Sequence, residues 1–286
     1  MGHLKNHPDE STTVRASGAR SRVAHWLLSR WPWLGAWVLA ELFVAPRLRI
    51  KPLVPPAGAE CENVRVGGRL LRVHLLGSGP LVLLVHGWQG GAAQMLEIAE
   101  ALARVGFRVA LFDMPAHGES PGWTTSLVEF MAVLAEVAAR FGRVHALVGH
   151  SLGGMAAILS AARGLEVAAV VALCPMPSLA FGLSAFSRAF GLPPAAREHL
   201  ARRVHARTGL RGEDVDLIAI TPRAPTLLVH DLLDRAVPVR HSRQLRDRWP
   251  NAKLIETRGW GHDRILRAPQ VTLAISAFLL GLSDSA

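Results

Sequence analysis

The hydrophobic pattern of the chain alternates between short apolar runs and longer stretches whose apolar residues recur at helical spacing. The clearest runs are residues 81–85 and 167–173, which are continuously apolar and rich in Val and Leu. A run of this kind predicts a parallel strand that is buried on both faces. Because helical stretches lie between the runs, the pattern predicts an α/β domain with a mostly parallel central sheet and helices on both faces.

The same pattern gives the expected elements in order. Strands are expected at residues 63–66, 69–76, 81–85, 107–112, 144–148, 167–173, 226–230 and 252–257. Helices are expected around residues 92–104, 127–140, 239–249 and 269–280. The first two strands are separated by Gly67-Gly68, which predicts a hairpin.

A segment rich in Trp and Leu, residues 24–44, precedes the expected sheet. Arg30, Pro32 and Glu41 interrupt it, which argues against a secretory signal and leaves too short an uncharged stretch for a membrane span. An amphipathic helix remains, which either packs on the domain, the interpretation we prefer, or lies on a membrane surface with Trp at the interface. Residues 1–22 are polar and charged and are expected to form a disordered tail.

The alternation of strand and helix stops between residues 175 and 222. This segment has Phe and Leu residues in short helical stretches and is too long for a connector. We interpret it as a helical cap between a first part of the core, residues 59–174, and a second part, residues 223–286. Residues 23–58 hold the Trp-rich helix and a Pro-rich connector that is expected to be extended.

Composition adds few constraints. The chain has 286 residues, enough to bury a large core without disulfides. Its 32 basic and 22 acidic residues give a formal charge of +10, but the arginines are scattered and not interleaved with aromatic residues, so we expect no nucleic-acid binding. Cys61 and Cys174 do not make a disulfide framework. We expect a cytoplasmic protein, with peripheral membrane contact through the Trp-rich helix as an open alternative.

Candidate chemistry begins with Gly-His-Ser-Leu-Gly at residues 149–153. An apolar run precedes this motif and small, helix-prone residues follow it, which is the strand–turn–helix context of a nucleophile elbow. The two glycines have a steric reason, because side chains there would collide with the neighbouring strand or helix. Ser151 is the candidate nucleophile, and the N–H of Leu152 is expected to face an anion at a helix N-terminus.

Three further motifs follow expected strands. They are His86-Gly87-Trp88, the segment 230–238 (HDLLDRAVP) and Gly259-Trp260-Gly261-His262. With the serine motif, all of them lie at carboxyl ends of strands, where open α/β sheets place their functional sites.

Serine is a weak nucleophile and needs a base, for which His262 is the candidate. Asp234 is the candidate acid that would fix the imidazole tautomer and stabilise the imidazolium. Asp231, three residues earlier, is a second candidate for the acid, but it is expected to hydrogen-bond the backbone of its own turn.

With nucleophile, acid and histidine in this order, residues 60–282 resemble the α/β-hydrolase superfamily. The chain is similar to a bacterial group of hydrolases with HGW, GHSLGG and HDxxDxxVP motifs. Residues 113–120 also resemble the D-x-P-G-x-G-x-S loop of the superfamily, but carry Ala116-His117 where Gly and a variable residue are commoner. The resemblance favours Asp234 as the acid and implies that the N–H of Trp88 is the second oxyanion donor.

The sequence therefore predicts a serine hydrolase that cleaves a carboxylic ester, or a thioester or lactone, through an acyl-enzyme. The Phe and Leu content of residues 175–222 suggests an apolar group in a small-molecule acyl substrate. No metal or other cofactor is expected, since no His, Asp or Glu cluster shows ligand spacing. Three alternatives remain open: a C–C bond hydrolase, an acyltransferase with the same triad, and a non-catalytic, membrane-associated protein of the same fold.

The other histidines are assigned structural roles. His86 is expected to hydrogen-bond beneath the oxyanion loop, His150 to pack beside the nucleophile, and His117 to brace its own loop. The remaining histidines are expected at the surface.

Overall fold

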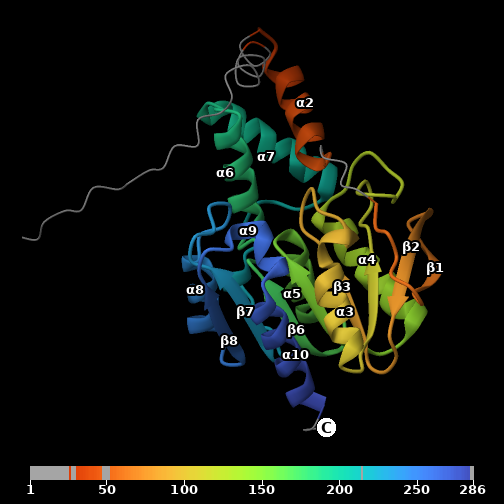
Figure 1. Cartoon of the computed structure of the whole chain (residues 1–286). Helices are drawn as coiled ribbons and strands as arrows, with labels where there is room; N and C mark the ends of the chain where they lie inside the picture. The colour runs from red at the N-terminus through yellow and green to blue at the C-terminus, as the bar shows by residue number, and fades with distance from the viewer. Residues whose placement is uncertain (1–25, 27–29, 47–51, 214, 284–286) are drawn as a thin grey trace, which may run out of the picture.

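The computed structural model describes Trp26 and residues 30–46, 52–213 and 215–283. Within these residues the chain forms an eight-stranded sheet with helices on both faces (Figure 1). The strands are β1 (Glu60–Val66), β2 (Arg69–Leu76), β3 (Leu81–Val85), β4 (Arg108–Phe112), β5 (Val144–His150), β6 (Val167–Leu173), β7 (Thr226–Asp231) and β8 (Ala252–Thr257). Their order is β1-β2-β4-β3-β5-β6-β7-β8. The pairs that include β2 are antiparallel and the others are parallel, so the predicted fold class is confirmed.

The antiparallel edge of the sheet is the predicted hairpin. Val66 pairs with Arg69 across a two-residue turn of Gly67 and Gly68. Both glycines have positive φ, 53° and 81°, as a type I′ turn requires at its two central positions.

Two hydrophobic clusters cover the two faces of the sheet. In β3, Leu83 and Val85 point to one face and Val82 and Leu84 to the other, so this strand is buried on both sides. The first face is covered by α4 (Leu127–Phe141), α5 (Leu152–Ala162) and α8 (Arg240–Arg248). The second face is covered by α3 (Leu96–Arg104) and α10 (Pro269–Ser283).

Helix α4 shows how the sequence sets these boundaries. The side chain of Ser126 accepts a hydrogen bond from the N–H of Glu129, which caps the first turn. Phe130, Val133 and Val137 recur at helical spacing and are buried. The capping residue and the apolar stripe therefore place the start of the helix and the face that it packs on the sheet.

The described residues between β6 and β7 include two α-helices that lie above the carboxyl ends of the strands (Figure 1). Helix α6 (Leu179–Ala189) begins at Ser178, which accepts a hydrogen bond from Phe181 N. Helix α7 (Pro194–Thr208) begins with a proline and ends at Gly209, which has a φ of 74°. We call α6 and α7 the cap helices.

Helix α2 (Pro32–Val44) lies against the cap helices at the top of the molecule in Figure 1. Leu39, Ala40 and Val44 are buried, whereas Trp31 and Trp37 are exposed. The ring of Phe43 lies edge-on to Phe186 of α6, with ring centroids 5.3 Å apart. The expected tail, and most of residues 24–29 in the Trp-rich segment, lie outside the described residues, as do residues 47–51 of the connector.

In the part of the chain that the structure describes, no helix is by itself long and apolar enough to cross a bilayer. A bent pair, Gly261–Arg267 with Pro269–Leu282, passes by length and composition only.

Candidate active site

Ser151 occupies the turn between β5 and α5 with φ 53° and ψ −116°. A positive φ is uncommon for any residue other than glycine and marks local strain. Two hydrogen bonds hold the turn: Ser151 N donates to Leu173 O at 2.9 Å, and Met176 N donates to Ser151 O at 3.1 Å. The predicted strand–turn–helix geometry around the serine is therefore present.

The glycines of the elbow are required by close backbone contacts. A Cβ on Gly153 would lie 2.3 Å from Val85 O, and a Cβ on Gly149 would lie 2.3 Å from Gly153 O. Both distances are far shorter than any real contact of a Cβ atom. The steric reason expected from the sequence is thus found between α5, β3 and β5.

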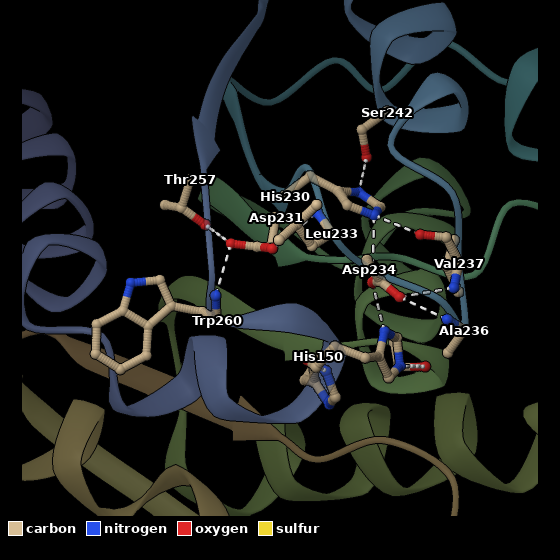
Figure 2. Close-up of polar contacts among 12 residues, drawn as sticks. His150, His230, Asp231, Leu233, Asp234, Ala236, Val237, Ser242, Thr257 and Trp260 are labelled. Carbon is tan, nitrogen blue, oxygen red and sulfur yellow. Dashed lines mark hydrogen bonds and ion pairs between the residues drawn. The ribbon is translucent and has the colours of Figure 1, made fainter.

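Asp234 lies in the loop after β7, and both of its carboxylate oxygens have hydrogen-bond partners. Its Oδ1 accepts hydrogen bonds from Ala236 N at 2.8 Å and Val237 N at 2.9 Å (Figure 2). Its Oδ2 lies 2.6 Å from His262 Nδ1. Burial alone would raise the pKa of Asp234, but hydrogen bonds from His230 and His262 hold that pKa well below its usual value. The carboxylate is therefore ionised at neutral pH.

His262 lies at the start of the short helix α9 (Gly261–Arg264) and faces both Asp234 and Ser151. An ionised carboxylate can only accept, so Nδ1 of His262 carries the proton that Asp234 accepts. Its Nε2 is then an acceptor, and it lies 3.0 Å from Ser151 Oγ. The structure thus brings together three side chains that the sequence separates by as many as 111 positions.

Asp231 makes different contacts. Its Oδ1 accepts from Leu233 N at 2.9 Å, and its Oδ2 accepts from Thr257 Oγ1 at 2.8 Å and Trp260 N at 3.0 Å (Figure 2). Burial alone would raise the pKa of Asp231, but these hydrogen bonds lower it. Asp231 therefore bonds its own turn, as expected, and also holds the end of β8 and the loop that leads to His262.

His230 is a site residue that sequence reasoning missed, since it was assigned to the surface. It is fully buried, with Nδ1 2.7 Å from Ser242 Oγ and Nε2 2.8 Å from Val237 O and 3.3 Å from Asp234 Oδ2. Because a carbonyl and a carboxylate both face Nε2, that nitrogen carries the proton. The expectation of a surface position was wrong because His230 lies within β7, which is buried along its whole length. His74 of β2 is also buried.

The loop after β3 is held from below by two neutral histidines. His86 Nε2 accepts from Met114 N at 2.9 Å and its Nδ1 donates to Gly87 O at 2.8 Å. His117 Nε2 accepts from Gln89 N at 3.1 Å, and its Nδ1 donates to Pro115 O. Burial lowers the pKa of both and brings that of His117 to about 3. The roles expected for these two histidines match their contacts.

The two expected oxyanion donors lie in this loop and at the elbow. Leu152 is the first residue of α5, where an N–H has no acceptor within the helix. In the loop after β3, the N–H of Gln89 is used by His117, and Trp88 is the residue before it. A Cβ on Gly87 would lie 3.0 Å from Ser151 Cβ, so glycine there lets this loop approach the serine.

His150 does more than pack beside the nucleophile. Its Nε2 donates to the backbone carbonyl of His262 at 2.9 Å, which joins the elbow to the loop that carries the histidine. Burial, and then the nearby charge of His262, lower the pKa of His150 to about 3. No adjacency in the sequence signals this bond, because the two residues are 112 positions apart.

The departure from the superfamily loop at residues 116 and 117 is visible in the backbone. Ala116 has a φ of 65°, a conformation that glycine adopts more easily. Gly118, with a φ of 49°, lies so close to Asp113 that a Cβ would be 2.0 Å from its Oδ2. Asp113 in turn accepts from Ala92 N at 2.7 Å and Glu119 N at 3.0 Å, which fixes the loop.

Among the described residues, two groups of three side chains have potential metal-ligand atoms within 4.8 Å of one another. They are His150 with His262 and Asp263, and Cys174 with Asp234 and His262. Ligand spacing along the sequence could not have indicated them, because they come from separate strands and loops. Both groups include His262, whose nitrogens already face Asp234 and Ser151.

Comparison with known proteins agrees with this architecture. Residues 80–223 match the family described as alpha/beta hydrolase fold, and residues 209–283 match the family described as TAP-like protein. Pimeloyl-(acyl-carrier protein) methyl ester esterase of Xanthomonas campestris pv. campestris is 29% identical over 262 residues, which cover 74% of this chain and 100% of that protein.

Two solved structures share the fold. Est1E of Butyrivibrio proteoclasticus, solved with ferulic acid, has a TM-score of 0.61 and 23% identity, covering 78% of this chain and 99% of its own. A bacterial membrane phospholipase A has a TM-score of 0.61 and 23% identity, covering 94% of this chain and 95% of its own.

Proposed function

The chain belongs to the alpha/beta hydrolase fold family and is an ester-cleaving hydrolase of the carboxylesterase type, and from this we propose that it works through an acyl-enzyme on Ser151. In this proposal His262 is the general base and acid, and Asp234 is the acid that orients it. The N–H groups of Leu152 and Trp88 form the oxyanion hole.

One observation carries the proposal, the continuous line of contacts from the serine to the acid. Ser151 Oγ lies 3.0 Å from His262 Nε2, and His262 Nδ1 lies 2.6 Å from Asp234 Oδ2. Both distances are within the range in which a proton is transferred or shared between side chains. The tautomer that Asp234 imposes leaves Nε2 free to accept the serine proton.

Acylation follows from this geometry. Ser151 Oγ attacks the ester carbonyl carbon while its proton passes to His262 Nε2, and the carbonyl oxygen becomes an oxyanion near Leu152 N and Trp88 N. The ionised Asp234 stabilises the imidazolium that forms. His262 then gives its proton to the departing alcohol oxygen as the C–O bond breaks, which leaves an ester on the serine.

Deacylation repeats these steps with water. A water molecule takes the place of the alcohol and loses a proton to His262 Nε2 as its oxygen attacks the acyl carbon. The proton then returns to Ser151 Oγ when the carboxylic acid leaves. The same three side chains serve both halves of the cycle.

The substrate that we propose is an ester with an apolar acyl chain. The curated relative is named for the methyl ester of an acyl chain carried on a protein, which supports an aliphatic acyl group. The segment between β6 and β7, whose helices lie above the strand ends, is rich in Phe and Leu, which also favours an apolar acyl group. A thioester or lactone would use the same residues and the same steps.

Labelling with a fluorophosphonate tests the nucleophile. We expect wild type to be labelled and Ser151→Ala not to be labelled, while the matched control Ser160→Ala, a buried serine of α5, keeps full labelling. Labelling that survives in Ser151→Ala would refute the proposal, and so would a folded wild-type protein that is never labelled.

Turnover separates the proposed reaction from its alternatives. We expect hydrolysis of p-nitrophenyl esters, with kcat/KM rising as the acyl chain lengthens from acetate. Acyl transfer to an added alcohol in preference to water would indicate an acyltransferase. Labelling without turnover of any ester would point to another bond, such as the C–C bond of a diketone.

A further inference from the structure

We propose that Trp26, Arg30, Trp31, α2 and the cap helices form a surface that docks on an anionic lipid bilayer. This docking does not depend on the proposed hydrolysis. The surface is defined by Trp26, Arg30, Trp31, α2, α6 and α7, and lies at the top of the molecule in Figure 1.

Exposed tryptophans mark this surface. Trp26, Trp31 and Trp37 are 58%, 42% and 49% exposed, and they lie within 12 positions of one another. Trp26 and Trp31 pack edge-to-face, with ring centroids 5.6 Å apart. Large indole rings held in water cost free energy, whereas at a bilayer interface their apolar body and polar N–H are both accommodated.

The C-terminal half of α2 packs on the domain. Leu39, Ala40 and Val44 are buried there, and the helix packs along α7. The exposed tryptophans lie before the helix or in its N-terminal half, at positions 26, 31 and 37. Packing on the domain and docking on a membrane are therefore compatible, because they use different ends of this segment.

The cap helices supply positive charge next to the tryptophans. Residues 179–208 contain five arginines and one glutamate, and all five arginines are exposed. The arginines are Arg188, Arg197, Arg202, Arg203 and Arg207. Glu41 of α2 lies 3.9 Å from Arg207, and Glu198 lies 3.8 Å from Arg202, so the other three keep their charge for a partner of opposite sign. Tryptophan beside exposed arginine is the pattern of helices that lie in a bilayer interface.

The surface continues to the loop between β4 and α4. The N–H of Thr125 donates to the carbonyl of Val44 at 2.8 Å, and Arg207 donates to Thr124. Trp123, beside them, is 82% exposed. The loop that bears Trp123 also carries His117, which bonds the oxyanion loop. A docked molecule would thus bring its strand ends, and not the opposite edge of the sheet, toward the lipid.

Co-sedimentation of the full chain with vesicles tests the proposal. One set of vesicles is pure phosphatidylcholine and the other is an equal mixture of phosphatidylcholine and phosphatidylglycerol. We expect wild type to bind the mixed vesicles and to bind the neutral ones far less. The triple variant Trp26→Ala/Trp31→Ala/Trp37→Ala should bind at least about tenfold more weakly. Its matched control is Leu273→Ala, an exposed apolar residue of α10.

A second pair of variants tests the charge. Arg188→Gln/Arg203→Gln should weaken binding to mixed vesicles by about fivefold per arginine, whereas Arg240→Gln/Arg248→Gln on α8 should leave it unchanged. Figure 1 places α8 far from α2, so the two pairs differ in location and not in charge removed. Quenching of tryptophan fluorescence by brominated lipid in the wild type gives a readout that needs no variant.

Three results would overturn the proposal. The first is that wild type sediments with neither set of vesicles. The second is that the tryptophan triple variant is folded by circular dichroism and yet binds vesicles as wild type does. The third is that the cap and α8 arginine pairs lose equal amounts of vesicle binding. Saturable binding to an acidic carrier protein, without vesicle binding, would assign the surface to a protein partner and would also refute lipid docking.

Discussion

Replacing Asp234 by Asn separates the chemistry of the proposed acid from its packing, because the two side chains have nearly the same shape. The amide oxygen of Asn can keep the bonds from Ala236 N and Val237 N. The amide nitrogen then takes the place of Oδ2, 2.6 Å from His262 Nδ1. Since an NH2 group only donates, Nδ1 must become the acceptor and the proton of the imidazole must move to Nε2.

The cost can be estimated from that change of tautomer. With a proton on Nε2, His262 cannot accept the proton of Ser151. In Ser-His-Asp hydrolases the wrong tautomer lowers kcat by about 10⁴, which corresponds to about 5.4 kcal/mol of transition-state stabilisation. We therefore expect Asp234→Asn to retain its fold and to lose about four orders of magnitude in kcat on a p-nitrophenyl ester at neutral pH.

Asp231→Asn is the matched control, since it is the same substitution three residues away. It leaves one buried donor, Trp260 N, without an acceptor, and should lower the free energy of unfolding by about 1–3 kcal/mol. We expect its kcat to fall by about tenfold at most, because the loop that carries His262 shifts while the tautomer stays correct. Urea unfolding of both variants corrects kcat for the folded fraction. A larger corrected loss in Asp231→Asn than in Asp234→Asn would refute the assignment of the acid.

Three further predictions rest on other parts of the structure. Burial lowers the pKa of His150 to about 3, so below about pH 6.5 the unfolded chain binds a proton that the native state does not. Between pH 7 and pH 5, the free energy of urea unfolding should therefore fall by about 2 kcal/mol more in wild type than in His150→Gln. Equal losses in the two proteins would contradict this. Gly153→Ala would place a Cβ 2.3 Å from Val85 O and should abolish cooperative thermal unfolding, whereas the exposed Gly281→Ala in α10, with nothing within 4 Å, should gain about 0.5–1 kcal/mol. His230→Ala removes one donor from Asp234 and should cost about 2–4 kcal/mol in urea unfolding and about tenfold in kcat; unchanged values of both would argue against its positioning role.

The sequence was most informative where backbone geometry restricts the choice of residue. Only glycine fits at positions 149 and 153 of the elbow, so the sharp turn after β5 leaves a readable pattern. The acid follows β7 and the histidine follows β8, and parallel strands bring their carboxyl ends to one edge. The order of these motifs therefore predicted which segments the fold would bring together, and the resemblance to the superfamily was needed to choose Asp234 over Asp231.

Contacts between distant loops left no such pattern. From the sequence alone, His230 could be exposed to water or buried beside Asp234, and only the position of β7 between β6 and β8 decides which. The bond from His150 to the carbonyl of His262 involves a backbone atom, which no residue type encodes. Which residues of α2 stay exposed was likewise open, because that helix has apolar residues around its whole circumference and only its packing on α7 decides which of them are buried.

Helix α2 also ties the cap helices to the body of the protein. Its Phe43 meets Phe186 of α6, and the carbonyl of Val44 at its end accepts from Thr125, just ahead of α4. Because α2 contacts both the cap helices and the body, we expect the cap helices to stay in place and not to move as a hinged lid. We therefore expect substrate selectivity to depend on the fixed shape of the site beneath the cap helices and not on an opening movement of these helices.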